Sequence, residues 1–355
     1  MIKVLQIIGG NSFGGIVKLM LEIEKNIDNE IKFEFLTASN ICDNWNNLNT
    51  NRKTLKGKIQ YNYRLFKFFK KHKYDIVHIN SGAFFFTFQV AIICKLRRIK
   101  KIVVHSHNTH NIIGLKKVLI KLLSPLYRKM IDVKLTCSTE AAKSLFTKTE
   151  DVVVLKNGID IEKFKFNENA RVEYRKKLEI EEKIVYGHVG RFEIQKNHEF
   201  LIDLFYELQK KQDDAVLLLV GNGTLEQYIK DKVHNLNIDN KVIFLGFRDD
   251  INILLNCMDI FIFPSLYEGL PVTIIEAQTS GLPVFVSNGI SEETKINHNF
   301  YKINSFDVGQ WISSILNIEL SERTNSYKDT IKAGYDIKDT CKSLERIYKS
   351  LIEKE

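Results

Sequence analysis

Short apolar segments alternate with longer amphipathic segments along almost the whole of this sequence. This alternation is typical of βαβ units, in which parallel strands form a sheet and helices cover its faces. In the first half, the expected strands are residues 3–8, 32–37, 76–80, 101–105 and 134–137. In the second half, they are residues 184–189, 215–220, 241–244, 260–263 and 283–286. The sequence therefore predicts an α/β fold with two parallel sheets.

The length of the chain also indicates two domains, because its 355 residues exceed the ~100–200 residues of an ordinary domain. Residues 157–165, NGIDIEKFK, supply turn residues between the two sets of strands. We predict a first domain over residues 1–160 and a second over residues 161–328, with a cleft between them. Residues 329–355 have apolar residues at helical spacing and are expected to form a terminal helix that packs back on the first domain.

Several features of the sequence favour a cytoplasmic protein. The beginning, MIKVLQIIGG, lacks the long apolar core of a signal peptide, and no apolar run reaches the ~18–20 residues that cross a bilayer. The five cysteines form neither a C-x-x-C pair nor a disulfide framework, which fits a reducing compartment. The net charge of +9 admits nucleic acid, anionic lipid or phosphorylated ligands without selecting among them.

Residues 264–277, PSLYEGLPVTIIEA, place a loop and a helix start directly after an expected strand. Pro271 is a favourable first helical residue, and the N-terminus of a helix at this edge of a parallel sheet attracts anions. Glu268 lies in the loop and Glu276 about one and a half turns into the helix. Carboxylates accept hydrogen bonds from sugar hydroxyls, so two of them beside a phosphate site match a nucleotide sugar. A helix cap and a solvated glutamate would explain either residue alone.

Two further loops follow expected strands. Arg191 and Lys196 lie five positions apart after residues 184–189, where two cations can neutralise a leaving diphosphate without a metal ion. A pair of solvated surface charges is the alternative. Residues 9–15, GGNSFGG, follow the first strand, and their amides can approach a diphosphate or a sugar closely. A structural turn is the alternative there, and the dinucleotide fingerprint G-x-G-x-x-G is absent.

Taken together, these segments resemble the retaining GT-B glycosyltransferases of family 4. The family hallmark is two glutamates eight positions apart in a P-S-x-x-E-G-x-P…E-A string followed by G-x-P-V, and residues 264–284 match it. The family's V-G-R-L…K-G loop is similar to residues 189–197, with Asn197 where glycine is usual. Further matches are residues 157–164, 219–223 and 242–247. The resemblance implies two Rossmann-like domains facing a cleft, with the donor bound mainly by the second domain and the acceptor by the first.

The resemblance also implies roles for individual residues. Arg191 and Lys196 would hold the donor phosphates, and Glu268 would lie beside the donor sugar. Glu276 would hold the ribose hydroxyls, and the turn at residues 269–273 would contact the diphosphate. The donor-binding residues implied in this way are Gly14, Gly15, Gly190, Asn222, Phe247, Gly269, Leu270, Thr273 and Glu276. No residue is an obvious base, which leaves the departing phosphate to deprotonate the acceptor.

Three histidines follow the strand expected at residues 101–105, in the string HSHNTH. A metal site would need further ligands, and no Asp, Glu or Cys accompanies them at a suitable spacing, so we expect none. No D-x-D triplet occurs in the chain either, and no other cofactor is expected. In family 4 a histidine at this place lies against the donor sugar, and His107 matches it best by spacing. Whether it acts in chemistry, in positioning or in neither is open, while His78 matches a family position expected to be structural.

Three basic amphipathic stretches lie in the first domain, at residues 64–73, 95–101 and 114–129. They suit contact with anionic lipid headgroups, or the ordinary packing of helices on a sheet, and both interpretations stay open. A lipid-linked acceptor would make the positive charge useful. Nucleic acid is not expected as a partner, because no recognised binding module is present.

We therefore expect a metal-independent hexosyl- or N-acetylhexosaminyltransferase that uses a nucleotide-diphosphate sugar, with UDP as the commonest choice. Its expected acceptor is a hydroxyl of a lipid-linked saccharide or glycan. Richness in Lys, Ile and Asn suggests an AT-rich bacterial genome, where such chains often build surface polysaccharide. The alternatives are a non-catalytic GT-B subunit that binds a partner or glycan, and a UDP-sugar epimerase of the same fold. Intact Arg191, Lys196, Glu268 and Glu276 disfavour both.

Overall fold

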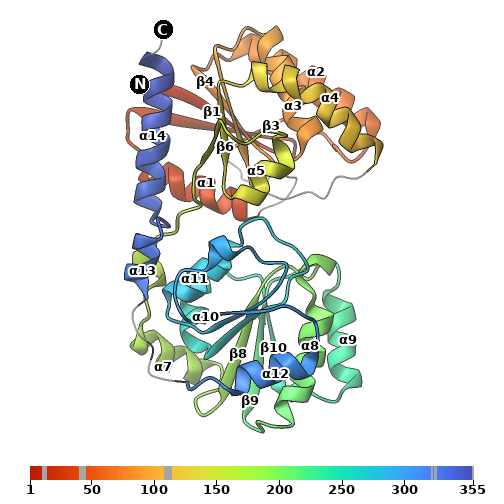
Figure 1. The fold of residues 1–355 in the computed structure, drawn as a ribbon, viewed down its shortest axis with the longest axis vertical. Coiled ribbons are helices and arrows are strands. Elements are labelled where there is room, and N and C mark those ends of the chain that lie inside the picture. The colour runs from red at the N-terminus through yellow and green to blue at the C-terminus, as the bar shows by residue number, and fades with distance from the viewer. Residues whose placement is uncertain (10–13, 40–44, 108–113, 321–322, 324–325, 354–355) are drawn as a thin grey trace. The chain divides into compact units, whose positions relative to one another are not determined.

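The structure is a computed structural model of residues 1–355, and it describes all of them except 10–13, 40–44, 108–113, 321–322, 324–325 and 354–355. The chain forms two compact units (Figure 1). The first unit contains Met1–Ile159 together with Tyr335–Glu355, and the second contains Asp160–Gly334. Both chain termini therefore belong to the first unit.

The first unit is built on a parallel sheet of seven strands, in the order β3-β2-β1-β4-β5-β6-β7. The strands are β1 (Ile2–Ile8), β2 (Ile31–Thr37), β3 (Asn46–Asn47), β4 (Ile76–Asn80), β5 (Lys101–Ser106), β6 (Val133–Thr136) and β7 (Val152–Val154). The five longer strands were predicted from the sequence. Strands β3 and β7 were missed because segments of two and three residues leave no measurable pattern.

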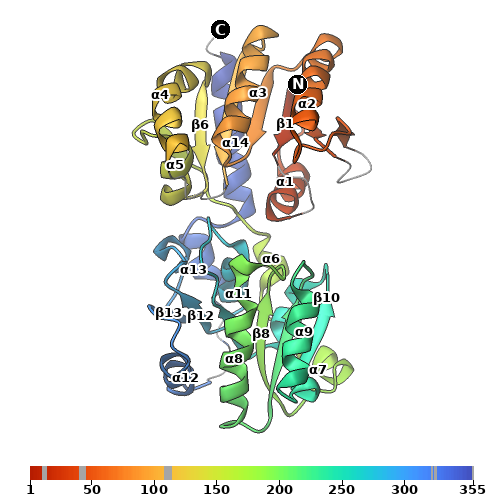
Figure 2. The same ribbon diagram turned by 90° about the vertical axis from the view of Figure 1, so that its right-hand side faces the viewer.

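Helices cover both faces of this sheet. One face carries α2 (Leu55–Lys71), α3 (Phe84–Leu96), α4 (Leu115–Met130) and α5 (Thr139–Leu145) (Figure 2). The other face carries α1 (Gly15–Asn26) and α14 (Ile337–Glu353). In α14 the buried residues Cys341, Leu344, Tyr348 and Leu351 recur at helical spacing and pack in the same cluster as α1. The last helix therefore completes the core of the first unit.

The second unit has a parallel sheet of six strands, in the order β10-β9-β8-β11-β12-β13. The strands are β8 (Ile184–Val189), β9 (Ala215–Val220), β10 (Val242–Gly246), β11 (Ile260–Phe263), β12 (Val284–Ser287) and β13 (Phe300–Ile303). Strand β13 was missed, because only its end residues Phe300 and Ile303 are buried and the chain before it is polar.

Helices also lie on both faces of the second sheet. Helices α8 (His198–Gln209), α9 (Glu226–Asn235) and α12 (Val308–Leu316) share one hydrophobic core with it. The remaining helices of the unit are α6 (Ile161–Phe164), α7 (Glu168–Lys177), α10 (Ile251–Cys257), α11 (Val272–Thr279) and α13 (Tyr327–Lys332). Helix α13 belongs to the second unit and overlaps the beginning of the stretch 329–355, which was expected to form a single terminal helix.

Each sheet reverses its strand order once, between β1 and β4 in the first unit and between β8 and β11 in the second. In open parallel sheets, ligands bind outside the carboxyl ends of the strands at such a reversal. The loops after β8 and β11 are the segments in which the sequence predicts phosphate and sugar ligands. Within the described residues, no helix combines the length and the apolar character that crossing a membrane requires.

Candidate functional site

Three loops are hydrogen-bonded to one another at the carboxyl edge of the second sheet. The backbone N–H of Phe192, after β8, donates to the carbonyl of Asn222, after β9, at 3.0 Å. The N–H of Leu266, after β11, donates to the carbonyl of Gln195 at 2.8 Å, and the Gln195 side chain donates to the carbonyl of Tyr267 at 2.9 Å. The loop after β8 is thus fixed between its two neighbours.

Glycine is required where these loops approach each other most closely. A Cβ atom at Gly190 would lie 2.7 Å from Nε2 of the buried His188. Gly221 has a φ of +138°, and a Cβ there would lie 2.1 Å from the carbonyl oxygen of Gly190. Because neither position has room for a side chain, the backbone itself forms this part of the surface.

Lys196 and Glu268 form an ion pair across two of the loops. The Lys196 Nζ lies 2.7 Å from Oε1 of Glu268, and the two side chains are only 16% and 11% exposed. The same ammonium group lies 4.4 Å from the centre of the Phe263 ring. The sequence predicted both charged residues as separate ligands of the donor, and the structure brings them into direct contact.

Arg191 contrasts with Lys196, because its side chain is exposed. Within the described part of the chain, no carboxylate lies at ion-pair distance from it. Its guanidinium group follows β8 at the reversal of strand order. This edge of the sheet therefore presents one cation whose charge is compensated by a neighbouring carboxylate and one whose charge is not.

Helix α11 begins beside this edge. It starts at Val272, one residue later than expected, and Pro271 occupies the N-cap position without a side-chain hydrogen bond to the helix. No acidic residue lies in its first turn, so the positive end of the helix dipole is not offset by the helix's own side chains. Thr273 lies in the first turn and Glu276 one turn further along, both partly buried. Gly269 and Leu270, in the turn before the helix, are buried.

The remaining residues that were predicted for the second domain lie at the same edge. Asn222 follows β9 and is exposed, and Phe247 follows β10 and is 54% exposed. The N–H of Gly221 donates to the carbonyl of Gly246 at 2.8 Å, which joins the loop after β9 to the loop after β10. The carboxyl ends of β8, β9, β10 and β11 thus carry all the site residues predicted for this unit.

Gly14, Gly15 and His107 belong to the first unit. Gly14 is the extended N-cap residue of α1, and a Cβ atom on Gly15 would meet no atom of the described residues within 4 Å. The rest of the predicted glycine loop, residues 10–13, lies outside the described residues. The last of the three histidines, at position 110, lies outside them as well.

His107 directly follows β5 and is 4% exposed. Its Nε2 lies 3.0 Å from Oδ1 of Asn80, and its ring centre lies 3.8 Å from that of His105. Burial lowers the pKa of His107 to about 3, so the imidazole is neutral at physiological pH. His78 is also buried, with Nδ1 2.6 Å from the Tyr348 hydroxyl, and burial lowers its pKa to about 3. Within the described chain, no three His, Cys, Asp or Glu residues are grouped as a metal site would require.

Sequence reasoning missed two buried histidines below the loop after β8. Nδ1 of His188 lies 2.8 Å from the carbonyl of Ile262, and the His198 ring stacks on Phe192 at 4.2 Å. Burial lowers the pKa of His198 to about 3 and that of His188 well below its usual value. Both imidazole rings are therefore neutral at physiological pH, and they lie near the side chain of Lys196. A single sequence does not show that the rings of His188, in β8, and His198, at the start of α8, are buried.

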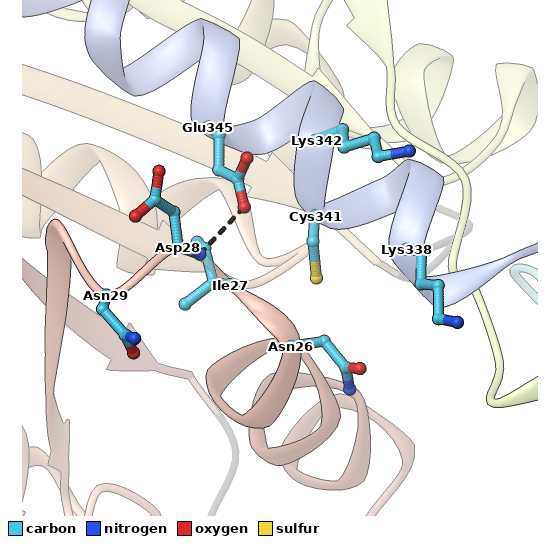
Figure 3. A pocket seen from close by; sticks show the side chains of 8 residues that line it. All are labelled: Asn26, Ile27, Asp28, Asn29, Lys338, Cys341, Lys342 and Glu345. Atoms are coloured by element: carbon cyan, nitrogen blue, oxygen red, sulfur yellow. Dashed lines mark hydrogen bonds between the residues drawn. The ribbon is translucent and has the colours of Figure 1, made fainter.

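An open pocket of about 460 Å³ lies elsewhere in the first unit, between the end of α1 and α14 (Figure 3). Its lining mixes Asp28 and Glu345 with Lys338 and Lys342, and the Asp28 N–H donates to Glu345 at 2.9 Å. Because α1 runs back from the carboxyl edge of the sheet, its end near Asn26 lies at the amino edge. This pocket contains none of the predicted site residues.

Family models match both halves of the chain. The model of glycosyl transferases group 1 matches residues 170–336, and the model of glycosyltransferase family 4 matches residues 44–163. The putative glycosyltransferase EpsF of Bacillus subtilis (strain 168) is 32% identical over 297 residues, which cover 79% of this chain and 76% of EpsF. The UDP-Gal:alpha-D-GlcNAc-diphosphoundecaprenol alpha-1,3-galactosyltransferase of Escherichia coli is 26% identical over 313 residues, or 81% and 78% of the two chains.

Solved structures share the fold over nearly the whole chain. Anabaena Alr3699/HepE in complex with UDP and glucose has a TM-score of 0.80 at 18% identity, covering 99% of this chain and 100% of that one. WaaG, a glycosyltransferase involved in lipopolysaccharide biosynthesis, has a TM-score of 0.72 at 18% identity, covering 97% and 99%. At these identities the likeness concerns the fold, and the predicted GT-B fold with two parallel-sheet domains is confirmed.

Proposed function

This chain belongs to glycosyltransferase family 4, and we propose that it moves a sugar from a nucleotide-diphosphate donor to a hydroxyl of an acceptor saccharide, with retention of the anomeric configuration. The observation that carries the proposal is the grouping of Arg191, the Lys196–Glu268 pair and the start of α11 on one sheet edge. In the proposed complex, that grouping would provide positive charge beside the departing diphosphate.

In the proposed reaction the diphosphate gains negative charge as the bond to the sugar breaks. Preorganised cations and helix N-termini stabilise such charge without moving. Arg191 would bind the phosphates directly, because no carboxylate among the described residues lies at ion-pair distance from it. Lys196 would act from a position fixed by Glu268 and the Phe263 ring. Charge stabilisation of this kind needs no metal ion, so we propose a metal-independent enzyme.

The carboxylate of Glu276 would accept hydrogen bonds from the ribose hydroxyls, and the turn at Phe247 would lie against the base. We propose UDP as the nucleotide and a hexose or N-acetylhexosamine as the sugar. The Escherichia coli relative is named for UDP-Gal, and the similar HepE was solved with UDP and with UDP-glucose. These names support the choice of donor.

For the acceptor we propose a lipid-linked saccharide in surface polysaccharide biosynthesis, at the cytoplasmic face of the membrane. The Escherichia coli relative is named for a sugar on diphosphoundecaprenol, and WaaG for lipopolysaccharide biosynthesis. An acceptor held in the bilayer requires an enzyme that reaches the membrane surface.

Helix α4, which has apolar residues on both its buried and its exposed face, supports such membrane contact. In α4, Ile120 and Tyr127 pack on the core, while the opposite face exposes Leu115, Val118, Leu119, Leu122 and Leu126. Leu115 is 89% exposed and Leu122 71% exposed. Helix α3, which packs on α4, exposes Phe85, Ile92 and Leu96, and helix α2, which packs on α3, exposes Ile59, Tyr63 and Phe66. Lysines 116, 117, 121 and 129 are exposed around the apolar face, and this combination suits an anionic lipid surface.

The test is release of UDP from a panel of UDP-sugars, with and without a lipid-diphosphate saccharide. We expect one donor to be consumed, with the α or β configuration kept in the product, and Arg191→Ala to abolish release. Lys210→Ala is a matched control, because Lys210 is paired with Glu207 at the far end of α8. A folded protein that binds glycan but releases no UDP from any donor would support the non-catalytic alternative. An inverted hydroxyl in the sugar would indicate an epimerase.

A further inference from the structure

Buried polar side chains occupy alternate positions of three adjacent strands in the first sheet. They are Gln6 in β1, His78 and Asn80 in β4, His105 in β5 and His107 just after it, and none is more than 4% exposed. In the strand register, Gln6 pairs with His78 and Asn80 pairs with His105. Side chains two positions apart share a face of a sheet. All five therefore project toward the face that α1 and α14 cover, beside Val4, Ile8 and Val103.

Hydrogen bonds join three of these side chains and the hydroxyl of Tyr348, in α14, into one chain. The side-chain amide of Gln6 donates to the Tyr348 hydroxyl at 3.0 Å. The amide of Asn80 donates to Oε1 of Gln6 at 2.8 Å. Oδ1 of Asn80 then lies 3.0 Å from Nε2 of His107. The last helix is thus connected to His107 through the interior of the first unit.

This chain of hydrogen bonds has a direction. A side-chain amide has one accepting and one donating end, so the bonds of Gln6 fix which end of Asn80 faces His107. Oδ1 of Asn80 can only accept, so the hydrogen must be on Nε2 of His107. The neutral ring then has a bare lone pair on Nδ1. That atom is buried and has no hydrogen-bond partner among the described residues.

We propose that Asn80 is a positioning residue, held by Tyr348 through Gln6, which fixes His107 as the Nε2–H tautomer and keeps Nδ1 as an acceptor for a hydroxyl of the donor sugar. The inference rests on the proposed function, because it takes the ligand of Nδ1 to be a hydroxyl of the donor sugar. If the side-chain amides of Gln6 and Asn80 were both rotated by 180°, every hydrogen bond in the chain would reverse its direction. Nδ1 of His107 would then carry the hydrogen and act as a donor. The tautomer of His107 therefore distinguishes the two arrangements.

Nitrogen NMR measures this tautomer directly. The whole protein is labelled with ¹⁵N-histidine, and the His107 signals are identified as those lost in His107→Gln. We expect a protonated Nε2 and an unprotonated Nδ1 at pH 7. A protonated Nδ1 in the wild-type protein would overturn the proposal, whatever the enzyme's activity.

Variants test whether the chain of hydrogen bonds fixes the tautomer of His107. Asn80→Ala should turn the single tautomer into a mixture and raise the donor KM about tenfold, as expected for one lost hydrogen bond. Asn80→Asp keeps an accepting oxygen at the same place and should keep Nε2–H. Tyr348→Phe should broaden the tautomer distribution by releasing Gln6.

Tyr127→Phe is the matched control for Tyr348→Phe. Both tyrosines are fully buried, and the Tyr127 hydroxyl is also bonded, to Thr87 at 2.6 Å, but on the opposite face of the sheet. Tyr127→Phe should lower the stability of the protein without changing the His107 signals or the donor KM. If Asn80→Ala leaves tautomer and KM unchanged in an active enzyme, the positioning role is wrong. If no donor is turned over at all, the proposed function fails, while the NMR result still decides the tautomer.

Discussion

The ammonium group of Lys196 lies 2.7 Å from the carboxylate of Glu268, at the point where the second sheet reverses its strand order. The pair joins the loop after β8 to the loop after β11. Because Glu268 offsets the charge of Lys196, a diphosphate would meet Arg191 as the stronger attraction. The division of charge between these residues leads to separate expectations for each.

Arg191→Ala should weaken the donor complex without destabilising the protein. A hydrogen bond to a charged group contributes about 1.5–3 kcal/mol, so we expect roughly a tenfold to hundredfold rise in the Kd for UDP. The melting temperature should stay within a degree, because the side chain is exposed. Isothermal titration with UDP measures the first effect and thermal unfolding the second. Unchanged UDP affinity would remove Arg191 from the donor site.

Lys196→Ala should destabilise the second unit, because it takes the ammonium away from beside a mostly buried carboxylate. The loss should be about 1–3 kcal/mol. Glu268→Gln in the same chain should restore part of it, since the carboxylate is then absent. A double-mutant cycle of unfolding midpoints gives the coupling. Additive effects of the two changes would show that the pair contributes no stability.

Glu268→Gln alone should separate UDP binding from sugar transfer. Removing the carboxylate increases the net positive charge near the phosphates, so UDP should bind at least as tightly as to the wild-type protein. Transfer should fall at least tenfold if the carboxylate contacts the donor sugar. Titration with UDP and single-turnover assays measure the two quantities. A variant with weakened UDP binding and normal transfer would contradict this separation.

Gly190→Ala should disrupt the loop that carries Arg191, since its Cβ would lie 2.7 Å from the His188 ring. Overpacking of this kind costs about 1–3 kcal/mol. Gly15→Ala is the control, because a Cβ there would meet no atom of the described part of the chain within 4 Å, and it should leave thermal stability unchanged or slightly raised. Equal stability of the two variants would be evidence against the close approach.

Stability should fall as the pH is lowered below about 6.5, the ordinary pKa of histidine. Burial, and then the charge of Lys196, lowers the pKa of His198 to about 3 in the folded protein. Between these values the unfolded chain takes up a proton that the folded protein does not. Unfolding is therefore favoured by up to ~1.4 kcal/mol per pH unit for such a histidine, and the stability is fully present above pH 6.5.

Urea unfolding at pH 7.5 and pH 5 measures this effect. His198→Phe, which keeps an aromatic ring on Phe192, should reduce the pH dependence. His234→Gln, at an exposed position, should not change it. An identical pH dependence in wild-type protein and His198→Phe would assign the effect to other groups.

The sequence predicted most of the strands, because buried parallel strands are continuous apolar runs bounded by turns. It also predicted which loops carry charged and glycine residues. It did not predict the ion pair of Lys196 with Glu268, which are 72 positions apart. Nor did it predict the contact between Gln6 and Tyr348, which are 342 positions apart. Such contacts depend on strand order and helix placement, and local patterns contain no information about either.

The separation of Met1–Ile159 from Tyr335–Glu355 along the chain has a consequence for synthesis on the ribosome. The second unit is continuous and can fold as soon as Gly334 has emerged. The first unit, although most of it is translated earlier, lacks α14 and the Tyr348 partner of Gln6 until α14 has been translated. Premature termination before Tyr335 would therefore release a chain with a foldable second half and an open apolar core in the first, which is the kind of product that chaperones and proteases recognise.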